Sequence, residues 1–211
     1  MSQENLQTAL GSVTLADALF YRRSVRKFAP EPVHPDRLRL AIEAACLAPS
    51  PHGSAPWRFC LVASPEARLR LAVEMGRDFL RDMAQEGVPE EERKRRHAGS
   101  LRLLTGAPAL ILAALSYQGL DSYADPAKQA NERMMAEHSL GAALQNLMLA
   151  LTAQGIGSVW RCAPLFCPET ARRALALPGD WVPRALVAAG RAEAPPPPKP
   201  KKKGERCFRF H

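Results

Sequence analysis

Residues 127–154 read AKQANERMMAEHSLGAALQNLMLALTAQ, and residues 155–160 continue as GIGSVW. Apolar residues recur in the first stretch every three or four positions and leave little of the helical circumference polar. A helix that is apolar all round is buried. Gly155 is suited to cap its carboxyl end, and residues 157–162 have the composition of a strand. The sequence therefore predicts a long central helix followed directly by a strand.

Shorter helices and strands are predicted on both sides of this helix. Thr14 with Asp17 forms a capping pattern, and Pro35 stands at a first helical position. Residues 49–56 and 116–127 are expected to be loops, and residues 89–100 are charged and expected to be exposed. The predicted helices span 15–23, 35–48, 65–86 and 168–175, and the predicted strands span 57–63, 108–115, 157–162 and 183–190.

Composition places the chain among ordinary globular domains. It has 211 residues, of which 46% are hydrophobic and 24% charged. No apolar run reaches 18 residues, and the polar amino end lacks the order of a signal peptide, so we expect neither a membrane span nor export. Five cysteines without a CxxC pair suit neither a disulfide framework nor a zinc site. We therefore expect a reducing, cytoplasmic location and no metal.

The positive charge is local. The formal net charge is +8, but residues 191–211 hold seven Lys or Arg and two Glu, and a smaller basic excess lies at residues 21–27. Local charge of this kind fits a bound phosphate at least as well as a duplex. After a proline-rich spacer the chain ends in KKKGERCFRFH (201–211), whose alternating apolar residues suggest a strand docked on another subunit. We therefore divide the chain into a domain, 1–193, and an extension, 194–211.

Three segments are candidates for chemistry. Residues 22–26 (RRSVR) offer the guanidinium and hydroxyl donors that a phosphate monoester binds, although a solvated helix end has the same composition. The proline-stiffened loop 49–56 permits close backbone approach, or is a plain connecting turn. Residues 155–164 place Trp160 after two glycines, or form a plain strand after a helix cap. His138 is expected in the core or at an interface. Because no nucleophile or metal motif is visible, a cofactor is expected to perform the difficult step.

Taken together, these segments resemble the nitroreductase family of FMN-dependent oxidoreductases. The likeness covers residues 15–190 and rests on RRSVRKF (22–28), APS through PWRF (48–59), SLGAA with QNL (139–147) and GIGS with Trp160. The wording PSPH (49–52) and residues 155–160 are most similar to the flavin domain of the bifunctional enzyme of deazaflavin coenzyme synthesis. The resemblance implies an α+β fold with a central, mostly antiparallel sheet wrapped by helices. It also implies a homodimer with a domain-swapped C-terminal tail and the long helix at the interface.

The resemblance also implies an FMN site shared between two subunits. Its members in this sequence are Arg22, Ser24 and Arg26 at the phosphate and ribityl chain, with Arg23 beside them; Pro49, Ser50 and Pro51 from the opposite subunit, with His52 near the flavin; Trp160, Arg161, Cys162 and Ala163 along the ring; and Lys201 or Lys203 completing the phosphate site. Many relatives have amide side chains where this loop has Gly53 and Ala55. Cys162 stands where an acidic residue is common.

The implied activity is ping-pong transfer of hydride from NAD(P)H, through FMN, to nitroaromatic, quinone or conjugated-alkene acceptors. The alternative within the family is a dedicated reductase of a dehydro precursor of the deazaflavin coenzyme. An alternative of another class is a nucleic-acid-binding module that uses the lysine-rich tail. It ranks last, because Phe208 and Phe210 favour docking and the basic stretches are short.

Overall fold

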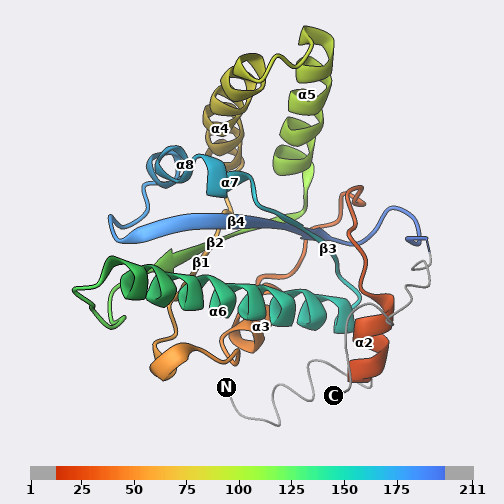
Figure 1. Cartoon of the computed structure of the whole chain (residues 1–211). Coiled ribbons are helices and arrows are strands. Elements are labelled where there is room, and N and C mark those ends of the chain that lie inside the picture. The colour runs from red at the N-terminus through yellow and green to blue at the C-terminus, as the bar shows by residue number, and fades with distance from the viewer. Residues whose placement is uncertain (1–12, 198–211) are drawn as a thin grey trace, which may run out of the picture.

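The computed structural model describes residues 13–197 and has the expected α+β architecture. An antiparallel sheet with strand order β1-β2-β4-β3 lies between two layers of helices (Figure 1). The elements are α2 (Leu15–Tyr21), α3 (Pro35–Ala45), the 3-10 turn η1 (Pro51–Gly53), β1 (Trp57–Leu61), α4 (Pro65–Gln85), α5 (Glu90–Gly106), β2 (Ala109–Ser116), α6 (Pro126–Ala153), β3 (Gly157–Arg161), α7 (Ala163–Phe166), α8 (Pro168–Ala174) and β4 (Trp181–Gly190).

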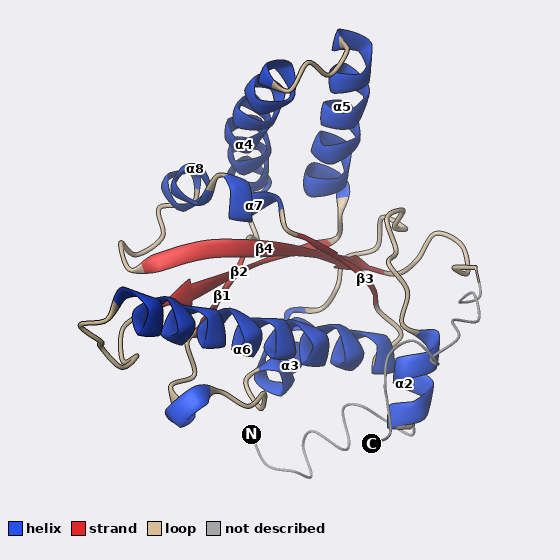
Figure 2. Ribbon diagram, in the orientation of Figure 1, coloured by secondary structure: helices blue, strands red, loops and turns tan. Residues whose placement is uncertain are grey.

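Strand β2 shows why the sheet is covered on both faces. Every residue of β2 is buried, and its side chains alternate between two cores. Ile111 and Ala113 pack with α3 and α6, whereas Leu110 and Leu112 pack with α4, α7 and α8. Figure 2 shows α6, α3 and α2 on one face, with α4, α7 and α8 on the other, where α4 and α5 project as a hairpin. The continuous apolar run at 108–115 is thus a strand buried on both faces, as predicted.

Helix α5 was not predicted as a helix from the sequence. The charged stretch 89–100 was expected to be exposed, and it forms most of a helix that extends to Gly106. The helix has no regular apolar period, but acidic residues occupy its first turn, where the helix dipole favours them. Ion pairs across one turn, Glu90–Lys94 and Glu92–Arg96, supply further local support.

The long helix α6 is buried on one side only. Ala136, Leu140 and Leu147 pack onto the sheet, but Met134 is 53% exposed and His138 is also exposed. The expectation of burial all round is therefore wrong for the single chain, because the sheet, α3 and α2 cover only part of the circumference of the helix. His138 does not lie in the core of the chain.

The amino-terminal segment 24–28 covers the outer edge of β3. Ser24 forms a parallel bridge with Ser158, and Phe28 an antiparallel bridge with Ala192. The amide of Val25 donates to the carbonyl oxygen of Ser158 at 3.0 Å. A Cβ atom on Gly157 would lie 2.8 Å from Val25 Cγ2, so glycine lets the two backbones approach. This pairing places Ser24 and Val25 beside the amino end of β3, at Gly157 and Ser158.

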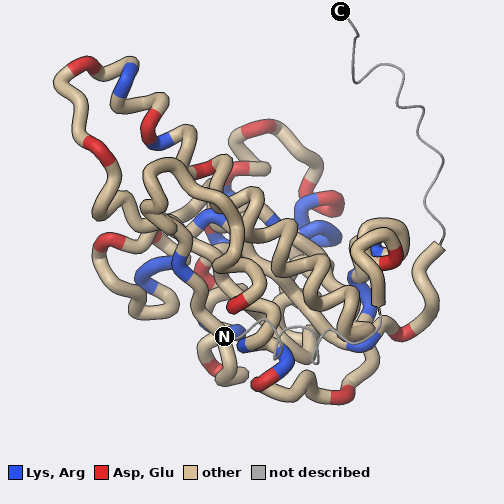
Figure 3. The backbone as a smooth tube through the Cα atoms, turned by 90° about the horizontal axis from the view of Figure 1, so that it is seen from below, with Lys and Arg blue, Asp and Glu red and all other residues tan. Residues whose placement is uncertain are grey.

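Three sequence expectations concern the carboxyl end of the chain. Lys201, Lys203 and most of the extension lie outside the described residues, so the tail swap and the domain division at 193 stay predictions. Over residues 13–197, no helix is long and apolar enough to cross a membrane. In Figure 3 the Lys and Arg positions are interspersed with Asp and Glu rather than gathered on one face.

Candidate functional site

The cluster Arg22–Arg26 begins where α2 ends. The Thr14–Asp17 capping box fixes the start of that helix, and Arg22 is its carboxyl-terminal cap. The guanidinium of Arg23 is used internally, since it donates to the carbonyl oxygens of Phe20, Arg22 and Pro197. Arg26 makes one long hydrogen bond, 3.3 Å, to the carbonyl oxygen of Ser24. Arg22 and Arg26 therefore keep donors available for an external anion.

A cavity of about 720 Å³ opens beside this cluster. The described residues give it five cationic side chains and one carboxylate, Glu193. Its lining consists of Arg26, Lys27, Phe28, Phe79, Arg96, Gly99, Ser100, Arg102, Leu103, Gly106, Ala107, Arg161 and Glu193. The volume lies in the range of small-molecule sites. The excess of positive charge selects for an anionic ligand.

Helix α5 forms one wall of the cavity, and sequence reasoning missed this wall. Gly99 and Gly106 both line it, and a Cβ atom on either glycine would meet open space. Gly99 lies in the helix interior, where glycine costs up to about 1 kcal/mol relative to alanine, so it was a readable signal, whereas Gly106 is the last residue of the helix. Without side chains there, a ligand can lie close to the helix backbone.

The end of β3 contributes a second wall. Arg161 lines the cavity, and its guanidinium has no hydrogen-bond or ion-pair partner among residues 13–197. Trp160 Nε1 is buried and also lacks a partner in the described chain. Cys162 is exposed at the start of α7, whose first residue is Ala163. Of the residues predicted in this segment, only Arg161 reaches the cavity directly.

The predicted loop Pro49–His52 lies on the other face of the sheet, against α6, and lines no part of this cavity. His52 has φ 53°, an uncommon conformation for a non-glycine residue. The amide of Ala55 donates to Ser50 Oγ at 3.0 Å, which fixes the turn. His52 Nε2 lies 3.7 Å from Asp121 Oδ2. The chain thus brings Arg26 and Arg161 together but keeps the loop apart, as expected if the loop serves a second subunit.

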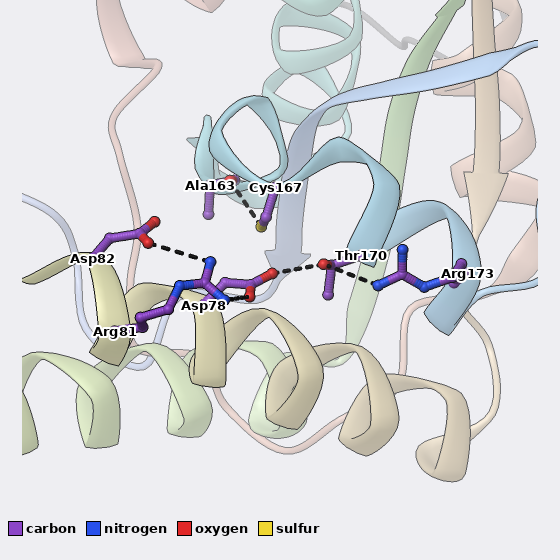
Figure 4. Close-up of polar contacts among 7 residues, drawn as sticks. All are labelled: Asp78, Arg81, Asp82, Ala163, Cys167, Thr170 and Arg173. Carbon is purple, nitrogen blue, oxygen red and sulfur yellow. Dashed lines mark hydrogen bonds and ion pairs between the residues drawn. The ribbon is translucent and has the colours of Figure 1, made fainter.

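A polar cluster anchors α4 to α8 (Figure 4). The hydroxyl of Thr170 donates to Asp78 Oδ2 at 2.6 Å, and Arg81 pairs with Asp78 at 2.9 Å. Cys167 lies beside this cluster, where burial, followed by the charges of Asp78 and Asp82, raises the pKa of its thiol to about 11. The thiol therefore stays protonated at neutral pH and is unsuited to act as a nucleophile. The cluster holds the hairpin, which carries α5, against the sheet.

Comparison with known proteins identifies the family. A sequence model of the nitroreductase family matches residues 19–191. The chain belongs to the nitroreductase family. Membership makes it an FMN-dependent oxidoreductase and confirms the resemblance found in the sequence. The finer likeness to the deazaflavin domain stays a prediction.

Individual relatives of this nitroreductase-family protein agree in length and fold. It is 33% identical over 186 residues to 5,6-dimethylbenzimidazole synthase of Rhodospirillum rubrum. The matched residues make up 86% of this chain and 84% of that protein. It is 28% identical to protein DrgA of Synechocystis, over 87% of this chain and 86% of that protein. A BluB-like flavoprotein of Clostridium difficile has the same fold, with a TM-score of 0.79 and 24% identity over 94% of this chain and 99% of that one.

The residues of this nitroreductase-family protein suit FMN. Arg22, Ser24 and Arg26 carry the guanidinium and hydroxyl donors that suit a phosphate monoester, whose charge is close to −2 at neutral pH. The orphan Nε1 of Trp160 is a buried donor that needs an acceptor. Within residues 13–197 no group of His, Cys, Asp or Glu side chains has the arrangement of a metal site.

Proposed function

We propose that the chain is an NAD(P)H-dependent reductase that passes hydride through FMN to an electron-poor acceptor by a ping-pong mechanism. The observation that carries the proposal is the basic cavity of about 720 Å³ between Arg26, α5 and Arg161. A ping-pong reductase needs room for donor and acceptor in turn beside one cofactor. The acceptor class is nitroaromatic, quinone or conjugated alkene.

The protein's own part is binding and orientation. FMN supplies the hydride chemistry when it is bound. Arg22, Ser24 and Arg26 hold the phosphate through charge-assisted hydrogen bonds. The bare α5 wall at Gly99 and Gly106 lets a flat substrate lie inside the cavity. Arg161 offers positive charge at the opposite wall, where it stabilises negative charge that develops during the reaction.

We also propose that the working unit is a homodimer. Phe20 and Tyr21 on α2 are 63% and 62% exposed, and Leu47 and Met134 are exposed on the same layer of helices. Large exposed apolar residues in such number mark a protein interface. A second copy packed on this layer supplies the Pro49–His52 loop to the first copy's flavin. That arrangement explains why the loop lies apart from the cavity in one chain.

The test combines a spectrum with a size measurement. Purified full-length protein is examined by visible absorption before and after anaerobic addition of NADPH, and its mass is determined by light scattering on a sizing column. Flavin bands that bleach, on a dimer, support the proposal. Protein that is colourless and binds no added FMN contradicts it. Flavin that stays oxidised with both NADPH and NADH excludes a nicotinamide nucleotide as the electron donor.

A second candidate is 5,6-dimethylbenzimidazole synthesis. It is favoured by the relative from Rhodospirillum rubrum, which is 33% identical over most of both chains. Aerobic incubation of the flavin-loaded protein with NADPH, followed by mass spectrometry, detects that product. Its formation, together with weak turnover of nitroaromatics and quinones, favours this activity over the general reductase.

The dedicated reductase of a deazaflavin precursor is favoured by the Pro51-His52 wording of the loop. Bound flavin that oxidises no NAD(P)H with general acceptors supports it, and strong unspecific turnover argues against it. The nucleic-acid alternative rests on a tail that lies outside the described residues. Absence of duplex binding at low salt removes it.

A further inference from the structure

The cavity holds more positive charge than the flavin phosphate requires. Lys27, Arg96, Arg102 and Arg161 line it in addition to Arg26, and Glu193 is the only acidic residue among its described lining. FMN brings a charge close to −2, located at the phosphate. Five cationic side chains around one cavity repel one another. A second bound anion would relieve the repulsion that the flavin phosphate leaves.

Arg102 is the best-placed residue for that anion. It lies on α5 and has no hydrogen-bond or ion-pair partner within residues 13–197. Arg96, on the same helix, is engaged by Glu92 through its Nε at 2.6 Å and Arg95 pairs with the same carboxylate. The charge of Arg96 is therefore partly neutralised, whereas that of Arg102 is not.

The helix geometry places Arg102 beside the bare part of the wall. At about 100° per residue, Gly99 and Gly106 point in nearly the same direction, and Arg102 lies about 40 to 60° to one side of them. Leu103 flanks the glycines on the other side. A flat ring that lies over Gly99 and Gly106 thus has an apolar edge near Leu103 and a charged edge near Arg102.

We infer that Arg102 forms a subsite for a negatively charged group, a carboxylate or phosphate, on the donor or acceptor that enters beside the flavin. The inference rests on the proposed function, since it assigns the substrate class of the same cavity. The guanidinium binds the anionic group in its planar fork, and the glycine wall accepts the ring to which that group is attached. Reduction of a neutral substrate gains nothing from this contact.

The first measurement is binding to the oxidised, flavin-loaded protein. Benzoate and benzamide have nearly the same shape and differ in charge, and each is titrated while the visible spectrum of the bound flavin is recorded. We expect benzoate to bind more tightly, and Arg102→Gln to weaken benzoate about tenfold relative to benzamide. Arg102→Glu weakens it further by repulsion. Arg95→Gln is the matched control, since Arg95 lies on the same helix and does not line the cavity.

Steady-state kinetics then identify the source of the anion. If the donor carries it, Arg102→Gln raises the ratio of the KM for NADPH to that for NADH about tenfold. If the acceptor carries it, the ratio of the KM for 4-nitrobenzoate to that for 4-nitrobenzyl alcohol rises instead. Either change supports the subsite when Arg95→Gln leaves both ratios in place.

Two results overturn the inference. One is equal binding of benzoate and benzamide before and after substitution, with both KM ratios unchanged. The other is purification of Arg102→Gln without flavin, because Arg102 would then bind the cofactor itself. Failure of the proposed function is recognised separately, since the unsubstituted protein would then show no bleaching with NAD(P)H.

Discussion

The guanidinium of Arg68 donates to the carbonyl oxygen of Ala107 at 2.6 Å and thereby ties the first turn of α4 to the carboxyl cap of α5. It also donates to the carbonyl oxygens of Val62, at 2.7 Å, and Pro108, at 3.3 Å. One half-buried side chain thus satisfies three backbone acceptors at the base of the hairpin. Burial lowers the pKa of Arg68, but the guanidinium stays charged.

Replacing this residue is expected to loosen the hairpin. Arg68→Met leaves three carbonyl oxygens without their donor and lowers the free energy of unfolding by about 2 to 4 kcal/mol. Urea denaturation followed by circular dichroism measures the change. The control Arg77→Met removes an exposed pair with Glu74 on the same helix and costs less than about 1 kcal/mol. Equal decreases in the free energy of unfolding for the two variants would show that the hydrogen bonds of Arg68 stabilise the fold no more than an exposed ion pair does.

Gly157→Ala is expected to separate the segment 24–26 from β3. The added Cβ meets Val25 at 2.8 Å, and overpacking of this kind costs about 1 to 3 kcal/mol. Because the same contact positions Ser24 and Arg26, flavin content after purification falls with stability. Gly179→Ala, whose Cβ meets open space, is the matched control. Full flavin content in Gly157→Ala would mean that this pairing does not position the phosphate donors.

Arg26→Ala is expected to weaken FMN binding about tenfold or more, because it removes a charge-assisted contact to the phosphate. Titration of flavin-free protein with FMN, followed by flavin fluorescence, gives the dissociation constant. Arg39→Ala removes an exposed arginine on α3 that pairs with Asp36, and it leaves FMN affinity in place. Identical affinities for the two variants would remove Arg26 from the phosphate site.

Glu137→Gln is expected to break a network at the far end of the sheet. Glu137 Oε1 accepts from Arg184 Nε at 2.6 Å and from the hydroxyl of Tyr117 at 3.2 Å. Burial, the largest influence on it, raises the pKa of Tyr117, so the hydroxyl stays protonated. Loss of the carboxylate leaves the largely buried Arg184 without its counter-charge and costs about 1 to 3 kcal/mol. Glu169→Gln, in an exposed pair, is the control, and a similar loss there would contradict the argument.

Cys167 gives the unfolding free energy a dependence on alkaline pH. The pKa of this thiol is about 11 in the folded chain, against 9.0 as its ordinary value. Between these values the unfolded chain releases the proton first, so the contribution of Cys167 is complete below pH 9 and disappears as pH rises toward 11. Urea denaturation at a series of pH values is expected to show a shallower decline for Cys167→Ala. Parallel declines would show that the thiol does not couple to folding.

Periodicity predicted most of the architecture, because the apolar pattern directly reports burial. The run 108–115 and the long helix at 127–154 required no tertiary information. Helix α5 was harder to predict, since its stability depends on ion pairs and on the hairpin with α4 rather than on an apolar face. The sheet order is set by contacts between distant segments, which leave no local period.

The site was predictable to the extent that its chemistry is local. The cluster Arg22–Arg26 shows its donors in the sequence. The glycines and the tryptophan singled out the segment that contains Arg161, and the family resemblance added Arg161 itself. Arg102 and Phe79 reach the same cavity only through the hairpin, so their role depends on tertiary structure. Arg68 likewise is one arginine among many in the sequence, and its three carbonyl partners appear only in the fold.

The bridges from Ser24 to Ser158 and from Phe28 to Ala192 join the first part of the chain to the last strands. During synthesis, which proceeds from the amino end, the segment that carries Arg22 and Arg26 emerges before its bridging partners in β3 and after β4 have left the ribosome. Under the proposed function, FMN therefore binds only after the carboxyl-terminal strands have been synthesised. A chain truncated before Ala192 carries the arginine cluster in its sequence but lacks the edge that holds it in place.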